Sequence, residues 1–146
     1  MDVFTSHFGR ISVESDDVLS FPAGLLGMED CRRWVLLADL QNDAVAWMQS
    51  IDRPAVAVAV VTPRRFVPDY QMRIPRHELA PLQLADVKHA KVLLIMGKTD
   101  GAMTLNLKAP LVVNLDRRIG RQVITNGDLP VRYELENEKP VCRRIA

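Results

Sequence analysis

Residues 105–125, LNLKAPLVVNLDRRIGRQVIT, restrict the possible folds of this chain more than any other segment. Leucine, valine or alanine occupies each odd position from 105 to 115, whereas most even positions are polar or charged. Side chains alternate between the two faces of a strand, so this pattern is typical of a strand buried on one side. DRRIG then predicts a charged turn, and RQVIT a returning strand. The segment as a whole predicts a long, bent strand, a turn and a partner strand.

Two residues interrupt this alternation. Pro110 has no amide hydrogen to donate to a neighbouring strand, so we expect it at a sheet edge, a bulge or a change of pairing partner. Val112 places an apolar group on the polar face, either in a second packed layer or on a surface that contacts a partner. The packed layer is favoured, because apolar side chains are usually buried. Asn106 and Asn114 flank Pro110, and side-chain hydrogen bonds that shape the bend are favoured over partner contacts.

Short apolar or alternating segments recur along the rest of the chain. They predict strands at residues 9–13, 18–21, 34–40, 46–52, 55–61, 91–99 and 131–135. The segment AVAVAVV at 55–61 is apolar on both faces, so we expect it to be covered on both sides. The Asp-Gly pair at 100–101 is typical of a two-residue hairpin and would join the strand at 91–99 to the central segment. FPAGLLG contains Gly24 and Gly27. We expect these glycines to be structural and to allow the backbone conformation of a tight connection.

Helical signals are few. Residues 75–84 are the best candidate, since Pro75 suits a first helical position, and Pro81 limits the segment to a short or broken helix. MEDCRRW at 28–34 predicts a short helical turn. Many short strands with one or two short helical segments predict an all-β, strand-dominated fold, either a barrel or a sandwich.

Length and composition predict a single soluble domain. The chain has 146 residues, of which 48% are hydrophobic and 25% charged, which favours a globular protein over a disordered one. Lysine and arginine number 19 against 18 acidic residues, so the net charge of +1 provides no global attraction to nucleic acid or to a membrane. Arginines do cluster, at 64–65 and 117–118 for example, so a local basic patch is compatible with the sequence. Without a secretory signal or a long apolar run, we expect a cytoplasmic protein.

The residues that usually carry chemistry are scattered. His7, His77 and His89 are far from one another and have no metal-ligand spacing. Cys31 and Cys142 form no C-x-x-C motif and are expected to be reduced thiols. The chain also lacks P-loop, G-x-G-x-x-G and G-x-S-x-G patterns. We therefore expect no catalytic residue, no metal and no cofactor.

Several segments, taken in order, resemble the flagellar assembly factor FliW family. They are FPAGLLGMED with WVLLADL, WMQSID, the valine strand at 55–61, TPRRFVPDY and TLNLKAPLVVNLDRRIGRQVI, and the resemblance covers roughly residues 7–125. The last matches the family's N-L-x-A-P-(I/L)-V-(I/V)-N pattern followed by G-(R/K)-Q, and it is the most specific of the set. Met28 is a departure, because an aromatic residue is common at that position in the family.

The resemblance implies a small β-barrel-like domain at residues 1–135, followed by a charged C-terminal tail at 136–146. It implies no enzymatic activity and two protein partners. One is flagellin, held in the cytoplasm before export. The other is CsrA, an RNA-binding regulator that represses flagellin translation, and export of flagellin would free the factor to bind and antagonise it. We expect a monomer when free. The alternative is a small ligand-binding β-barrel or an enzyme with an unrecognised site.

Candidate partner-binding residues lie in two segments. The loop at 63–70 has two prolines that would stiffen it around its apolar side chains, which could form a contact ridge or fold back to cap the barrel; both alternatives are open. The second segment surrounds Pro110. The predicted partner-binding residues are Phe66, Val67, Tyr70, Asn106, Val112 and Asn114.

Overall fold

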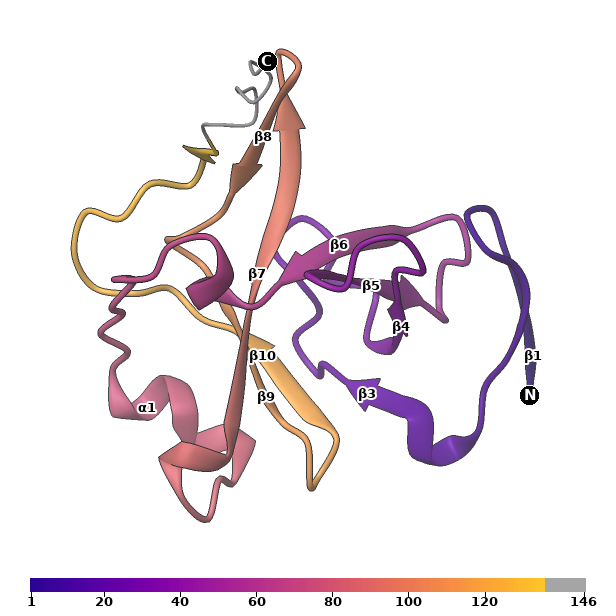
Figure 1. Cartoon of the computed structure of the whole chain (residues 1–146). Helices are drawn as coiled ribbons and strands as arrows, with labels where there is room; N and C mark the ends of the chain where they lie inside the picture. The colour runs from indigo at the N-terminus through magenta and orange to yellow at the C-terminus, as the bar shows by residue number, and fades with distance from the viewer. Residues whose placement is uncertain (136–146) are drawn as a thin grey trace.

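The computed structural model describes residues 1–135, excluding the side chain of Val87, and the predicted tail at 136–146 lies outside the described residues. Strands dominate the fold (Figure 1). The strands are β1 (Asp2–Thr5), β2 (Gly9–Ser12), β3 (Val18–Ser20), β4 (Arg33–Ala38), β5 (Val45–Ser50), β6 (Ala57–Val61), β7 (Ala90–Thr99), β8 (Ala102–Leu105), β9 (Leu111–Asn114), β10 (Ile119–Gln122) and β11 (Tyr133–Glu134). The helical segments are η1 (Ser15–Asp17), η2 (Pro63–Arg65), α1 (Arg76–Leu79), η3 (Ala80–Leu82) and η4 (Val87–His89).

Seven of these strands close into a barrel. The order is β7-β6-β5-β4-β3-β10-β9, and β9 pairs back onto β7. Neighbouring strands are antiparallel except β3 and β10, which run parallel and meet at Ser20 and Ile119. The hairpin β1–β2 forms a separate sheet, whereas β8 and β11 extend the main sheet outside the ring. The prediction of a strand-dominated, barrel-like fold is therefore confirmed, and the barrel replaces the sandwich alternative.

The long strand β7 holds the barrel together, because successive parts of it pair with different neighbours. Its first residues pair with β9 from Ala90 to Leu93, its middle pairs with β6, and its end pairs with β8. The β7–β8 hairpin projects from the barrel (Figure 1). Asp100 and Gly101 at its tip have φ values of 52° and 83°, as a type I′ turn requires, so the predicted hairpin is confirmed.

The central segment bends at the predicted proline. Pro110 separates β8, which pairs with the end of β7, from β9, which pairs with the beginning of β7. It therefore marks a change of pairing partner, one of the three expected possibilities. The Oδ1 atom of Asn106 accepts hydrogen bonds from the amides of Lys108 (3.1 Å) and Ala109 (3.0 Å). The predicted bend-shaping role of Asn106 is thus confirmed.

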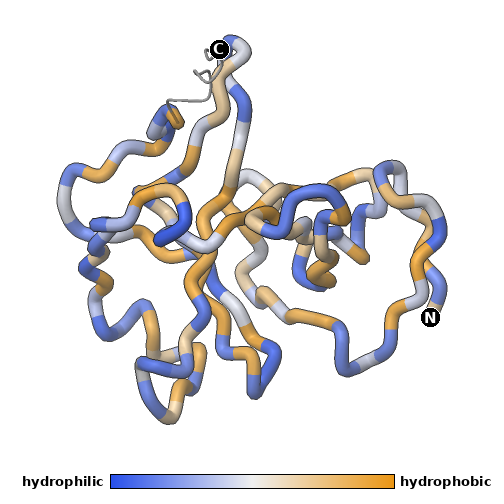
Figure 2. Tube along the Cα trace, in the orientation of Figure 1, coloured by the Kyte–Doolittle hydropathy of each residue, from blue (hydrophilic) through white to orange (hydrophobic). Residues whose placement is uncertain are grey.

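Large side chains fill the barrel interior. Trp34 on β4 is fully buried, and its Nε1 donates to the carbonyl of Cys31 at 2.9 Å. Phe21, Met48 and Leu111 pack in the same cluster and are also 0% exposed. Figure 2 shows hydrophobic residues along the barrel strands and hydrophilic residues at several loop tips. The interior is therefore a packed core.

Two local predictions were inaccurate. MEDCRRW forms no helix; instead Leu25 and Met28 form an isolated bridge, and the segment passes directly into β4. The predicted strand at 9–13 is confirmed as β2, and it pairs with β1, a strand that was not predicted. The predicted strand at 131–135 is reduced to β11. The predicted helix at 75–84 is confirmed as short, since α1 ends at Leu79 and a tighter 3-10 turn that contains Pro81 begins at Ala80.

Candidate functional site

The loop at 63–70 folds onto the barrel. Val67 is only 8% exposed, and half-buried Phe66 packs against the same apolar cluster. The hydroxyl of Tyr70 donates to the carbonyl of Leu107 at 2.7 Å, and burial raises the pKa of Tyr70 to about 12. Val67 and Tyr70 therefore act as parts of a cap, whereas Phe66 and Tyr70 each keep part of their surface exposed.

The residues beyond Pro110 are buried. Val112 is 1% exposed and packs with Leu82 and Val123, so it has no surface with which to contact a partner and the packed-layer alternative is confirmed. Asn114 is 4% exposed. Its Nδ2 donates to the carbonyl of Leu82 at 2.9 Å, and its Oδ1 accepts the amide of Asp116 at 3.1 Å. Asn114 thus ties η3 to the turn after β9.

The six predicted residues do not form one surface. Phe66, Val67 and Tyr70 pack in a cluster with Leu107, one residue beyond Asn106. Val112 belongs to a different cluster, beneath η3. Val67, Val112 and Asn114 are buried in the folded chain, so their side chains pack inside the protein and are not presented at its surface.

Replacing Asn114 by alanine is expected to lower the free energy of unfolding by roughly 2–3 kcal/mol, because it leaves buried carbonyl and amide groups without partners. Asn42→Ala is the control, since Asn42 is exposed and its Oδ1 accepts the amide of Ala44. Chemical denaturation measures both variants. Equal losses in the two variants would show that Asn114 is not a structural link.

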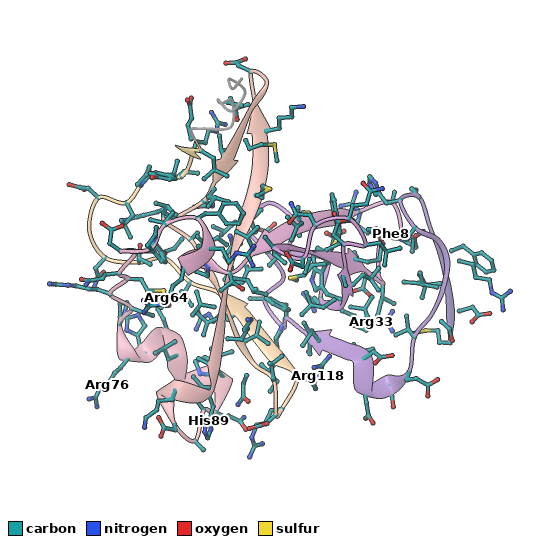
Figure 3. All side chains as sticks on the ribbon, in the orientation of Figure 1. Phe8, Arg33, Arg64, Arg76, His89 and Arg118 are labelled. Atoms are coloured by element: carbon teal, nitrogen blue, oxygen red, sulfur yellow. The ribbon has the colours of Figure 1, made fainter. Side chains whose placement is uncertain are left out.

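An aromatic surface near the N-terminus was not predicted. The rings of His7 and Phe8 lie 6.4 Å and 5.8 Å from the ring of Trp47, between the β1–β2 turn and β5. Figure 3 labels Phe8 at this end of the molecule. The amide of Gln41 and the indole N–H of Trp47 hold the pKa of Asp39 below its usual value. These residues are far apart in the sequence, and no local pattern joins them.

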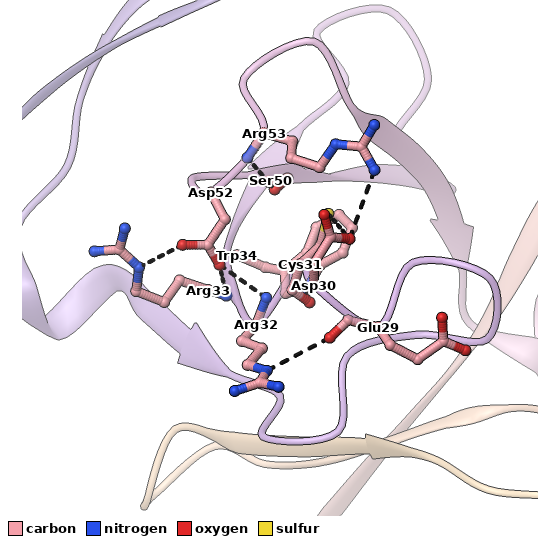
Figure 4. A network of polar contacts seen from close by, with 9 residues as sticks. All are labelled: Glu29, Asp30, Cys31, Arg32, Arg33, Trp34, Ser50, Asp52 and Arg53. Atoms are coloured by element: carbon pink, nitrogen blue, oxygen red, sulfur yellow. Dashed lines mark hydrogen bonds and ion pairs between the residues drawn. The ribbon is translucent and has the colours of Figure 1, made fainter.

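A polar network fixes the entry to β4 (Figure 4). The Oδ2 atom of Asp52 accepts the amides of Arg32 and Arg33, both at 2.8 Å, and Oδ1 pairs with the guanidinium of Arg33 at 2.9 Å. Partial burial opposes ionisation of Asp52, but these hydrogen bonds outweigh it and the pKa is lowered. The first residues of MEDCRRW form a turn, in which the amide of Cys31 donates to the carbonyl of Met28 at 3.1 Å. The Asp52 network explains why the end of the segment continues as a strand and not as a helix.

A depression lies between η2, residues 70–73 and the start of β7, with a volume of about 570 Å³. Arg64, Arg73 and Lys91 line it together with Tyr70. The arginine pair at 64–65 was visible in the sequence as a possible basic patch. Residues 73 and 91 are distant from this pair in the sequence, and only the fold brings them to the depression.

Comparison with known proteins identifies the family. The model of the family described as FliW protein matches residues 2–135. The chain belongs to the FliW family. A flagellar assembly factor FliW from Bdellovibrio bacteriovorus is 38% identical over 135 residues, covering 90% of this chain and 77% of the relative. A flagellar assembly factor FliW from Natranaerobius thermophilus is 31% identical, covering 100% of this chain and 99% of the relative.

The fold agrees with a solved member of the FliW family. A crystal structure of the flagellar assembly factor FliW superposes with a TM-score of 0.86 and 28% identity, covering 96% of this chain and 100% of the other. Two of the segments that carry the FliW resemblance form special connections. FPAGLLG contains Gly24 and Gly27, with φ values of 69° and 84°, and NLKAP forms the bend before β9. Within residues 1–135, no helix has the length and apolar character needed to cross a membrane.

Proposed function

We propose that this FliW-family protein is a non-enzymatic assembly factor that binds flagellin in the cytoplasm and also binds and antagonises CsrA. In this proposal the free protein is a monomer. While flagellin occupies it, CsrA represses flagellin translation. Export of flagellin frees the protein to bind CsrA, and repression is relieved. The protein would thus couple flagellin export to flagellin synthesis.

The observation that carries this proposal is the FliW family match over residues 2–135, which spans the whole described barrel. The relatives and the solved structure bear the description flagellar assembly factor. Flagellin and CsrA are proposed as partners because the resemblance to the FliW family implies them.

The filled barrel favours a protein-binding role over a ligand-binding one. Phe21, Trp34 and Met48 occupy the interior with 0% exposure, where a ligand-binding barrel would keep space for its ligand. The depression described above lies on the outer surface. Partner recognition would therefore use the outside of the barrel.

The direct experiment measures binding of the purified protein to flagellin and to CsrA of the same organism by isothermal titration calorimetry. The proposal expects a complex with each partner, and a weaker CsrA signal when flagellin is already bound. A protein that binds neither partner would refute the proposal.

Phe66→Ala tests the part of the 63–70 loop in this binding. Because Phe66 keeps exposed surface, we expect near-normal thermal unfolding and binding to at least one partner weakened about tenfold, equivalent to about 1.4 kcal/mol. Phe4→Ala is the control, since Phe4 is 72% exposed on the separate β1–β2 hairpin and should leave binding unchanged. Much earlier melting of Phe66→Ala would instead show that Phe66 is a barrel cap.

A further inference from the structure

Three cations from separate parts of the fold line the depression beside β7. Arg64 lies on η2, Arg73 lies in the connection that leads to α1, and Lys91 lies near the start of β7. Figure 1 shows the chain passing from η2 down to α1 and returning as β7, and Figure 3 labels Arg64 on this side of the molecule. A protein with a net charge of only +1 therefore concentrates positive charge in one depression.

This positive charge is not neutralised within the described chain. The residues that line the depression include no aspartate or glutamate. Among the ion pairs of residues 1–135, none involves Arg64, Arg73 or Lys91. Neighbouring Arg65, by contrast, pairs with Asp43 at 3.7 Å. Three neighbouring positive charges produce a positive electrostatic potential in the depression. An anionic group would therefore be attracted to it.

The backbones that carry the three cations are held in place. The carbonyl of Arg73 accepts the amide of Asn126 at 2.8 Å, in an isolated bridge. Lys91 pairs with Val113 across the β7–β9 ladder, and its Nζ lies 3.5 Å from Thr62 Oγ1. In η2, the carbonyl of Pro63 accepts the amide of Val67 at 2.8 Å. A binding group would therefore meet positions that are already ordered, which lowers the entropic cost of binding.

The walls of the depression are partly apolar. Buried Pro63 and half-buried Val92 lie beside the cations, and Tyr70 contributes its ring while its hydroxyl is engaged with Leu107. Arginine guanidinium groups match carboxylates in geometry and bind them through paired hydrogen bonds. A mixture of cations and apolar surface suits a peptide in which acidic and apolar side chains are neighbours.

We propose that this depression binds an acidic segment of a partner protein, with its carboxylates on Arg64, Arg73 and Lys91 and an adjacent apolar side chain against Val92. The inference rests on the proposed function, because it assigns this site to the interface with flagellin or with CsrA. It also places the contact beside Phe66 and Tyr70, in the loop that the sequence indicated.

The test uses charge reversal in the full chain. Lys91→Glu and Arg73→Glu are expected to weaken binding to one of the two partners at least tenfold in calorimetry. Lys98→Glu is the matched control, since Lys98 is another exposed lysine on β7 but lies in the part that pairs with β8, outside the depression, and should change binding less than twofold. Thermal unfolding checks each variant. If a charge-reversal variant does not fold, the neutral variant at the same position, Lys91→Gln or Arg73→Gln, is measured in its place.

The outcomes separate this inference from the proposed function. If the wild type binds a partner and both depression variants bind equally well, the inference is wrong and the proposed function stands. If the wild type binds neither partner, the probe becomes a synthetic peptide, acetyl-Glu-Glu-Leu-Glu-Glu-amide, followed by NMR. Amide shifts around Lys91 that Lys91→Glu removes and Lys98→Glu retains would support the acidic-peptide site. Absence of such shifts, or equal shifts with inorganic phosphate or an RNA oligonucleotide, would overturn it.

Discussion

Replacing Trp34 by alanine is expected to lower the free energy of unfolding by about 3–5 kcal/mol. Trp34 extends from β4 into the barrel, is 0% exposed and packs in the same cluster as Phe21 and Met48. Truncation removes these contacts, leaves a cavity and deprives the carbonyl of Cys31 of the indole N–H that now lies 2.9 Å away. Chemical denaturation monitored by circular dichroism measures the loss.

Trp47→Ala is the matched control for this prediction. Trp47 lies on neighbouring β5, but it is half-buried and contacts the rings of His7 and Phe8 at the surface. Its truncation should cost clearly less than that of Trp34. If both variants lose the same stability, or if Trp34→Ala is nearly neutral, Trp34 is not the centre of the barrel core.

Gly24→Ala is expected to lower the free energy of unfolding by about 2–5 kcal/mol, because two effects combine. The φ value of Gly24 is 69°, a left-handed conformation that costs an alanine roughly 1–2 kcal/mol. A Cβ atom at this position would also lie 2.6 Å from the Cα of Glu29. Relieving that overlap with the backbone costs roughly 1–3 kcal/mol more. Thermal and chemical denaturation measure the sum.

Gly27→Ala separates the two effects. Gly27 has a φ value of 84°, but no heavy atom lies within 4 Å of the position that its Cβ would occupy. Its replacement should therefore cost only the conformational part, about 1–2 kcal/mol. A loss for Gly27→Ala as large as that for Gly24→Ala would contradict the close approach between Gly24 and Glu29.

The features predicted correctly from the sequence depend on local chemistry. Alternating side chains mark the central strands, and Asp100 with Gly101 adopts the positive φ values that the hairpin requires. Pro110 must interrupt a ladder because it has no amide hydrogen, and it does so where β8 gives way to β9. In each case residues close together in the sequence restrict their own backbone, so no knowledge of the rest of the fold was needed.

The features that were missed depend on partners distant in the sequence. MEDCRRW was predicted to form a helical turn, but the carboxylate of Asp52 binds the amides of Arg32 and Arg33 and directs the end of this segment into β4. Closure of the barrel by β7 and β9 is likewise a pairing that neither strand's own sequence specifies. Local propensity is a weak guide wherever such tertiary contacts compete with it.

At the candidate site, too, some features follow from the local sequence and others from contacts between distant residues. The sequence indicated the loop at 63–70 as a segment of interest and favoured a packed layer at Val112. It did not reveal that Val67 faces inward or that Leu82 is among the residues that cover Val112. Arg73 and Lys91 are separated by α1 and two 3-10 turns, so only the fold places them around one depression. The sequence shows which side chains could contribute to a site, whereas the fold decides which of them lie together around the depression.

We propose that this FliW-family protein transmits the state of flagellin export to CsrA. Fluorescence anisotropy of CsrA on a labelled RNA from the flagellin leader tests it most directly. We predict that the protein weakens the binding of CsrA to this RNA, and that adding flagellin restores it. CsrA that binds the RNA equally well with and without saturating amounts of the protein would contradict the claim, as would inhibition that flagellin cannot reverse.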